Sequence, residues 1–131
     1  MCLYNKKRVT TDKDITCYKV FEVRENGELR TPFRNSKYEL GKLRKLKREE
    51  VPFPWSSYIA SGAFHSFMTR KGARVFATGY KKRDVCIVKC KIPKESKYIY
   101  KGYFDGYGSY GSQQIFPVGI VEAYSNGKRV V

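Results

Sequence analysis

The sequence predicts one α+β domain over residues 1–131, mostly antiparallel β-sheet with one or two short helices. Several short runs alternate apolar and polar residues, as strands with one buried face do. Tyrosine, with 11 copies, and phenylalanine, with 8, are common, and both favour strands. The sequence has no internal repeat and no linker, and its length is that of one domain. These observations favour a single mixed domain over a helical bundle or a repeat array.

The first thirty residues predict a strand followed by a hairpin. Residues 1–14 are polar and basic, and indicate an arm or a poorly formed first strand. Residues 15–24 alternate apolar and polar side chains, which indicates a half-buried strand. Asn26-Gly27 comes next, and this dipeptide between two such runs is the strongest short hairpin signal.

Residues 36–49 allow two interpretations. Ser36 and Glu39 form a capping box, and leucines then recur every three residues, which favours a basic amphipathic helix over about 37–49. Gly41 counts against a helix, so an extended segment is the rival interpretation.

The rest of the chain predicts more strands and one clear helix. Thr69 is suited to cap a helix over about 70–79, with Ala73, Phe76 and Ala77 on its buried face. The remaining predictions are an extended or turning segment at 51–55, short strands at 56–60 and 61–67, a strong strand at 85–92, a tyrosine- and glycine-rich loop at 98–111, a strand at 113–124 that bends near Pro117 and Gly119, and a tight turn at Asn126-Gly127.

Basic residues dominate the composition and are clustered along the chain. The sequence has 27 Lys and Arg against 12 Asp and Glu, a formal net charge of +15. The clusters at 30–48 and 70–101 predict a one-sided basic surface that binds nucleic acid or an acidic protein surface. We expect polyanion contacts from Arg44, Lys45, Lys47, Arg48, Arg70, Lys71, Arg74, Lys81, Lys82 and Arg83.

Aromatic residues next to these basic clusters suggest single-strand binding, which uses stacking of bases on side-chain rings. The candidates are Tyr98, Tyr100, Tyr103, Phe104, Tyr107 and Tyr110. The alternative, which we favour at this point, is that alternate tyrosines are core residues and the glycine-rich stretch is only a loop.

Metal binding and membrane insertion are not expected. Cys86 and Cys90 share one face of a strand but lie about 13 Å apart along it, so one strand cannot bring both to a zinc ion. His65 is the single histidine. The sequence has no apolar run near the roughly 18 residues of a membrane span, and it begins with no signal-peptide pattern. We therefore expect a cytoplasmic protein with free thiols, no bound metal and unknown oligomeric state.

The order of three motifs resembles the ADP-ribosyltransferase fold. Tyr18-Lys19 lies in an early strand, Phe64 and Ser66 lead to the predicted helix, and Gln114 precedes a late apolar run. In that family the equivalent residues grip the cofactor, frame the nicotinamide pocket and stabilise an oxocarbenium-like centre. The resemblance implies that Lys19, Ser66 and Gln114 line one cleft that binds NAD.

Two of these positions depart from the family pattern. Lys19 stands where the family has Arg or His, and Gln114 stands where it has the catalytic Glu. Glutamine can hydrogen-bond a ribose but carries no charge to stabilise a cation. The resemblance therefore implies degenerate or altered activity.

Residues 15–124 also resemble an uncharacterised family of short bacterial and phage proteins. The resemblance rests on the Cys-Tyr-Lys-Val strand, the Phe-His-Ser-Phe segment and the strand that ends Lys-Cys-Lys-Ile-Pro-Lys. It implies an accessory role related to phages. Together with the charge, it favours a non-enzymatic basic binding protein without a cofactor, a phage-type accessory or inhibitor, over an ADP-ribosyltransferase-like domain.

Overall fold

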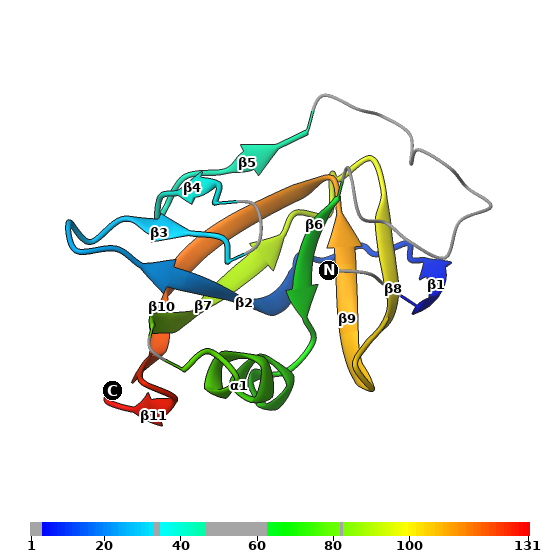
Figure 1. Ribbon diagram of the computed structural model, residues 1–131. Coiled ribbons are helices and arrows are strands. Elements are labelled where there is room, and N and C mark those ends of the chain that lie inside the picture. The colour runs from blue at the N-terminus through cyan, green and yellow to red at the C-terminus, as the bar shows by residue number, and fades with distance from the viewer. Residues whose placement is uncertain (1–3, 33–34, 47–62, 82) are drawn as a thin grey trace.

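A curled antiparallel sheet makes up most of the residues that the computed structural model describes, which are 4–32, 35–46, 63–81 and 83–131. The sheet bends like half a barrel, and helix α1 (Arg70–Thr78) packs against one of its faces (Figure 1). The strands are β1 (Tyr4–Arg8), β2 (Ile15–Val23), β3 (Leu29–Arg30), β4 (Lys37–Tyr38), β5 (Arg44–Lys45), β6 (Phe64–Phe67), β7 (Asp84–Ile92), β8 (Ile99–Phe104), β9 (Tyr107–Ser112), β10 (Gln114–Ser125) and β11 (Lys128–Arg129).

The strand order is β1-β8-β9-β6-β2-β7-β10-β11, and β3, β4 and β5 extend it at the side. The three long strands β2, β7 and β10 lie next to one another at its centre. Cys17 of β2 lies directly opposite Cys90 of β7, and this register continues to Glu22 opposite Val85. The predicted strands at 15–24, 85–92 and 113–124 are thus confirmed.

The bend predicted near Pro117 and Gly119 is confirmed as a shift of register. Pro117 lies opposite Cys90 and Gly119 opposite Lys89, so that one residue of β10 is extra. A bulge of this kind increases the local twist of a sheet. It contributes to the curl of β10 over β7.

Helix α1 forms as its sequence predicts. The hydroxyl of Thr69 accepts a hydrogen bond from the Gly72 backbone N–H at 3.2 Å, which caps the first turn. Ala73 and Ala77 are fully buried against the sheet. Small residues on this face let the helix lie close to β2 and β7.

The predicted loop at 98–111 is wrong, because these residues form the hairpin of β8 and β9. Asp105 and Gly106 connect the two strands with φ angles of +50° and +81°. These angles belong to the tight type I′ turn, which favours Asp-Gly. Glycine suits this hairpin for a second reason: a Cβ on Gly108 would lie 2.6 Å from the Sδ of Met68.

The helix predicted over 37–49 is wrong for the residues described. Lys37–Tyr38 and Arg44–Lys45 are strands, and Gly41 between them has a φ of +76° that no right-handed helix contains. Tyr38 is buried, with its ring 4.9 Å from that of Phe21. The extended interpretation is therefore confirmed up to residue 46, and residues 47–49 lie outside the described chain.

The remaining predictions differ in outcome. The hairpin turns at Asn26-Gly27 and Asn126-Gly127 are confirmed, and part of 61–67 forms β6. The first strand exists as β1, with an irregular register against β8. The predictions for 51–55 and 56–60 lie outside the described residues. Within the part of the chain that the structure describes, no helix is long and apolar enough to cross a membrane.

Two apolar clusters fill the two faces of the central sheet. The helix-face cluster contains Val20, Phe67, Ala73, Ala77, Val85, Ile87 and Tyr124. The opposite cluster contains Cys17, Phe21, Leu29, Tyr38, Phe64, Cys86, Val88, Cys90, Ile92, Ile99 and Ile115. Cys86 and Cys90 share this second face, as their even spacing predicts.

Candidate functional site

Basic side chains from three separate segments meet around helix α1. Arg70, Arg74 and Arg129 all approach the carboxylate of Glu122, although α1 and β11 are some fifty residues apart in sequence. The turn before β11 abuts the end of α1, since a Cβ on Gly127 would lie 3.2 Å from a carbonyl oxygen there. We call this region the α1 basic surface: Arg70, Lys71, Arg74, Lys81, Arg83, Lys128 and Arg129.

Glu122 holds the centre of the α1 basic surface. Its side chain is 0% exposed. It accepts hydrogen bonds at 2.9 Å from Arg70 and Arg74, and at 2.6 Å from the Tyr124 hydroxyl. The hydrogen bond from Arg74 is the main cause that lowers the pKa of Glu122 to about 2. One permanent negative charge thus fixes two guanidinium groups whose side chains remain more than 40% exposed.

A second acidic anchor lies at the other end of the same region. The Nη1 of Arg83 donates to the Oε1 of Glu22 at 2.6 Å, and Arg24 contacts the other oxygen at 3.2 Å. Arg83 also lies near the face of Tyr80, with its Cζ 5.9 Å from the ring centroid. This contact joins the α1 basic surface to a neighbouring aromatic pocket.

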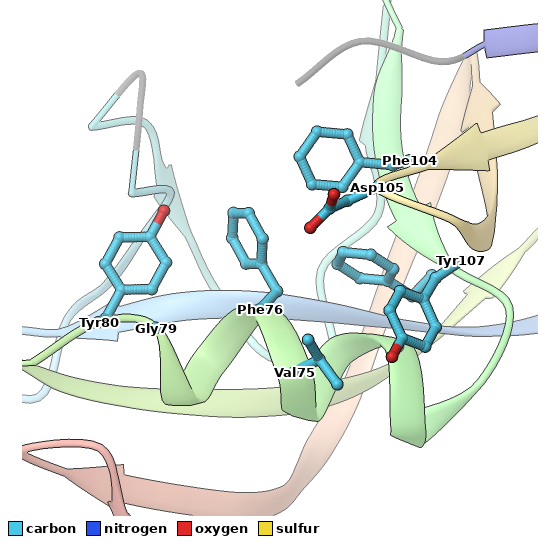
Figure 2. A pocket seen from close by; sticks show the side chains of 9 residues that line it. Val75, Phe76, Gly79, Tyr80, Phe104, Asp105 and Tyr107 are labelled. Atoms are coloured by element: carbon cyan, nitrogen blue, oxygen red, sulfur yellow. The ribbon is translucent and has the colours of Figure 1, made fainter.

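The aromatic pocket lies between α1 and the β8–β9 turn, and has a volume of about 280 Å³. Figure 2 shows the side chains that surround it. Rings form most of its wall: Phe76 lies 5.6 Å from both Phe67 and Phe104, and 5.2 Å from Tyr80, between centroids. The lining residues are Phe67, Gly72, Val75, Phe76, Gly79, Tyr80, Phe104, Asp105 and Tyr107.

Two backbone features build this pocket. The tight turn at Asp105-Gly106 places Phe104 opposite Tyr107 at the end of the hairpin. Gly72 lets the helix approach that hairpin, since a Cβ there would lie 3.2 Å from both Phe67 and Tyr107. The pocket is therefore formed by regular elements.

Asp105 is the acidic group of the pocket. It lies in the turn, and in Figure 2 its carboxylate points toward the space between Phe76 and Phe104. Among the described residues, no Lys or Arg forms an ion pair with it. A carboxylate only accepts hydrogen bonds, so it is suited to a ligand that donates them.

The predicted polyanion residues separate into two groups. Arg70, Lys71, Arg74, Lys81 and Arg83 lie together on the α1 basic surface. Arg44 and Lys45 lie in β5, at the far end of the molecule from α1 in Figure 1. Lys47, Arg48 and Lys82 lie outside the described residues. The described basic clusters are thus not all on one side.

Sequence reasoning missed Lys128, Arg129 and Asp105. The turn signal at Asn126-Gly127 indicated that the chain reverses before β11, but not that it reverses onto α1. The dipeptide Asp105-Gly106 is itself a hairpin signal. Of the proposed stacking residues, Phe104 and Tyr107 line the pocket, whereas Tyr98 is buried at 2% exposure.

Lys19 and Ser66 lie close together, on the sheet face opposite α1. The Nζ of Lys19 donates to the backbone oxygen of His65 at 2.6 Å. Both side chains lie next to the Cys17 thiol, and the charge of Lys19 acts on it. The Ser66 hydroxyl is buried and has no hydrogen-bond partner among the described residues. The Gln114 amide instead donates to the Gln113 side chain at 3.4 Å. Lys19 and Ser66 therefore lie together, whereas Gln114 forms its hydrogen bond with another residue, Gln113.

Burial dominates the chemistry around Lys19. It lowers the pKa of the Lys19 ammonium to about 8, although the neighbouring Cys90 and Cys17 act in the other direction. Burial also raises the pKa of the Cys17 thiol, but its contacts with Cys90 and Ser66 and the charge of Lys19 outweigh this and leave the pKa below its ordinary value. The rings of Tyr38 and Phe21 lie 5.8 and 6.0 Å from the ammonium.

Cys17, Cys86 and Cys90 are buried free thiols. Among the described residues, no group of three or more His, Cys, Asp or Glu side chains could hold a metal ion.

No protein-family model matches the chain, and neither do the curated proteins or the solved structures searched.

Proposed function

We propose that the protein is a non-enzymatic nucleic-acid-binding protein, a phage-type accessory or inhibitor, that contacts phosphates through the α1 basic surface. The observation that carries this proposal is the convergence of Arg70, Arg74 and Arg129 on the single buried carboxylate of Glu122. Three guanidinium groups share one negative charge, which leaves a local excess of positive charge. Guanidinium groups also suit phosphate, because their paired N–H donors match its oxygens.

The fixed geometry of the arginines supports this proposal further. Long exposed side chains lose conformational freedom when they bind a partner. Arg70 and Arg74 are already held by hydrogen bonds to Glu122, so part of this loss occurs on folding. Lys71, Lys81 and Lys128 are exposed and, among the described residues, form no ion pair, so they add charge without a structural role.

The test is fluorescence anisotropy with a labelled single-stranded oligonucleotide at several salt concentrations. About four phosphate contacts, with a slope of about −0.7 each, predict a roughly 50-fold loss of affinity between 50 and 200 mM salt. The triple variant Lys71→Glu, Lys81→Glu, Lys128→Glu is expected to weaken binding at least tenfold and to reduce the salt slope.

A second triple variant controls for net charge. Lys13→Glu, Lys91→Glu and Lys94→Glu make the same change at the far end of β2 and β7, where Ile15 lies opposite Ile92. This variant should bind much more tightly than the first. Equal losses in both variants, or no binding of the wild type at 50 mM salt, would contradict the proposal. Equal competition by polyglutamate would indicate an acidic protein partner instead.

We keep a second candidate, an ADP-ribosyltransferase-like domain with degenerate or altered activity. Lys19 and Ser66 favour it, because they lie on neighbouring strands and next to the same residue, Cys17. Calorimetric titration with NAD tests it: binding that is lost in Lys19→Met, without release of nicotinamide, is expected. No heat of binding at millimolar NAD would exclude this candidate.

A further inference from the structure

The aromatic pocket lies beside the α1 basic surface, and its lining residues include no Lys or Arg. We propose that it binds one unpaired base of a single-stranded nucleic acid, with a preference for guanine. This inference rests on the proposed function, since the α1 basic surface would hold the phosphates next to that base. It adds a base-selective site to a surface that by itself would bind phosphates irrespective of the base.

The size and walls of the pocket suit a nucleobase. Ligand pockets for drug-sized molecules begin at about 300 Å³, and a base is smaller than such a molecule. The volume of about 280 Å³ therefore accommodates one base. Phe76, Tyr80, Phe104 and Tyr107 supply ring surfaces, on which bases stack irrespective of their sequence.

Asp105 supplies the preference among bases. Its carboxylate has two acceptor oxygens and no donor. Guanine presents two adjacent donors on one edge, the ring N1–H and the exocyclic amino group, and so can donate to both oxygens. Thymine presents one N–H between two carbonyl oxygens, which the carboxylate repels. The geometry therefore favours guanine over thymine.

The surrounding charge selects an anionic ligand. An aromatic pocket with one carboxylate also suits a methylated ammonium group. The positive neighbours oppose such a cation: Arg83 lies 5.9 Å from the Tyr80 ring, and Lys71 and Lys81 flank the lining residues Gly72 and Tyr80 in sequence. A nucleotide carries its negative phosphate to these cations and its neutral base to the rings. Charge complementarity thus favours the nucleotide.

The walls of the pocket are set before a ligand arrives. Asp105 is held in a tight turn, and Phe76 lies in the capped helix α1. Ring contacts of 5.6 to 6.0 Å between Phe67, Phe76 and Phe104 fix them further. Little ordering is required when a base enters, which strengthens binding.

The test compares two labelled strands of ten nucleotides, one all thymidine and one with a single central deoxyguanosine. We expect the wild type to bind the strand with guanine about tenfold more tightly, as one good bidentate contact allows. The same strand annealed to its complement should lose this preference, since its guanine is then paired.

Asp105→Asn is the decisive variant. Asparagine tolerates the positive φ of this turn, so the fold should be kept. The amide replaces one acceptor by a donor, and the preference for guanine should fall to about twofold or less. Affinity for the thymidine strand should stay equal or rise, because a negative charge is lost. The control Asp84→Asn, at an exposed carboxylate, should leave the preference unchanged.

Phe104→Leu provides a second, independent variant. It keeps an apolar side chain but removes a ring, and should weaken binding of the guanine strand about fivefold, as loss of stacking does. Circular dichroism checks that each variant is folded.

The outcomes separate this inference from the proposed function. Equal affinity for both single strands, with salt dependence intact, overturns the base pocket and leaves the phosphate surface. Undiminished guanine preference in Asp105→Asn, or equal binding of the duplex, also overturns the pocket. No binding of either strand at 50 mM salt overturns both. Binding of a trimethyllysine peptide that Asp105→Asn abolishes would assign the pocket to a cation.

Discussion

The two faces of the central sheet bury charge in opposite ways. On the helix face, Glu122 is surrounded by three arginines, and its pKa falls to about 2. On the other face, Lys19 has no carboxylate partner among the described residues and donates to a backbone oxygen, and burial lowers its pKa to about 8. The buried Glu122 carboxylate keeps its charge, whereas the half-buried Lys19 ammonium gives up its proton more readily.

This difference has consequences for function and stability. A charge that is compensated by hydrogen-bonded partners is permanent over the physiological pH range, and so can organise a binding surface. A charge that is buried without a counter-ion costs folding free energy, and is kept only where the group is used or the cost is small. The helix face is therefore suited to a constant task such as phosphate binding, and the face around Lys19 responds to pH.

Glu122→Gln tests the helix face and should have the largest effect. Glutamine cannot accept from three guanidinium groups as a carboxylate does, so the free energy of unfolding at pH 7 should fall by about 2–4 kcal/mol. Because the folded state lowers the pKa of Glu122 from 4.5 to about 2, its contribution is present above pH 4.5 and is lost as pH falls toward 2. The difference between variant and wild type should shrink in that window.

Urea denaturation at pH 7, 4.5 and 3 measures both effects. Glu39→Gln is the matched control, because that side chain is 55% exposed and pairs with Lys42 at 3.6 Å, and its stability should equal that of the wild type. Unchanged stability at pH 7 would show that the arginines do not depend on Glu122.

The sequence predicted correctly those helices and strands that depend on contacts between residues close in the chain. Thr69 and the buried alanines gave helix α1, and the alternating run at 15–24 gave β2. The segment 37–46 misled because its leucines recur at a helical spacing, whereas the φ of Gly41 and the burial of Tyr38 keep it extended. Burial of Tyr38 against Phe21 is a tertiary contact, which overrides a local pattern.

The candidate site depends on contacts between distant segments. Arg70 and Arg74 were expected to bind a polyanion, but their shared carboxylate lies 52 and 48 residues further along the chain. The clustering of charge in sequence placed Arg44 and Lys45 with them, although β5 pairs with the opposite end of β10 from the Glu122 region. The position of Asp105 in a hairpin turn could have been predicted from the sequence, since Asp-Gly between tyrosine-rich runs indicates a hairpin.

Lys19→Met tests the other face and should have a smaller effect that depends on pH. Because burial lowers the pKa of Lys19 from 10.5 to about 8, the folded protein binds fewer protons than the unfolded chain between these values, and wild-type stability rises with pH across that window. Methionine carries no charge. The variant should therefore be most favoured relative to the wild type at pH 7, and lose on the order of 3 kcal/mol of that advantage by pH 10.5.

Chemical denaturation at pH 7, 8, 9 and 10.5 measures this trend. Lys42→Met is the control: because the Lys42 side chain is 70% exposed, the stability difference between this variant and the wild type should be the same at each pH. The titratable groups that act on Lys19 are Cys17, Cys90 and Arg44, and both variants retain them. If Lys19→Met keeps the full wild-type slope, the thiol of Cys17, whose pKa is lowered in the fold, titrates in this window in place of the ammonium. The contrast between the two faces would then be one of a thiol against arginines, and Lys19 would keep its proton across this window in the folded protein.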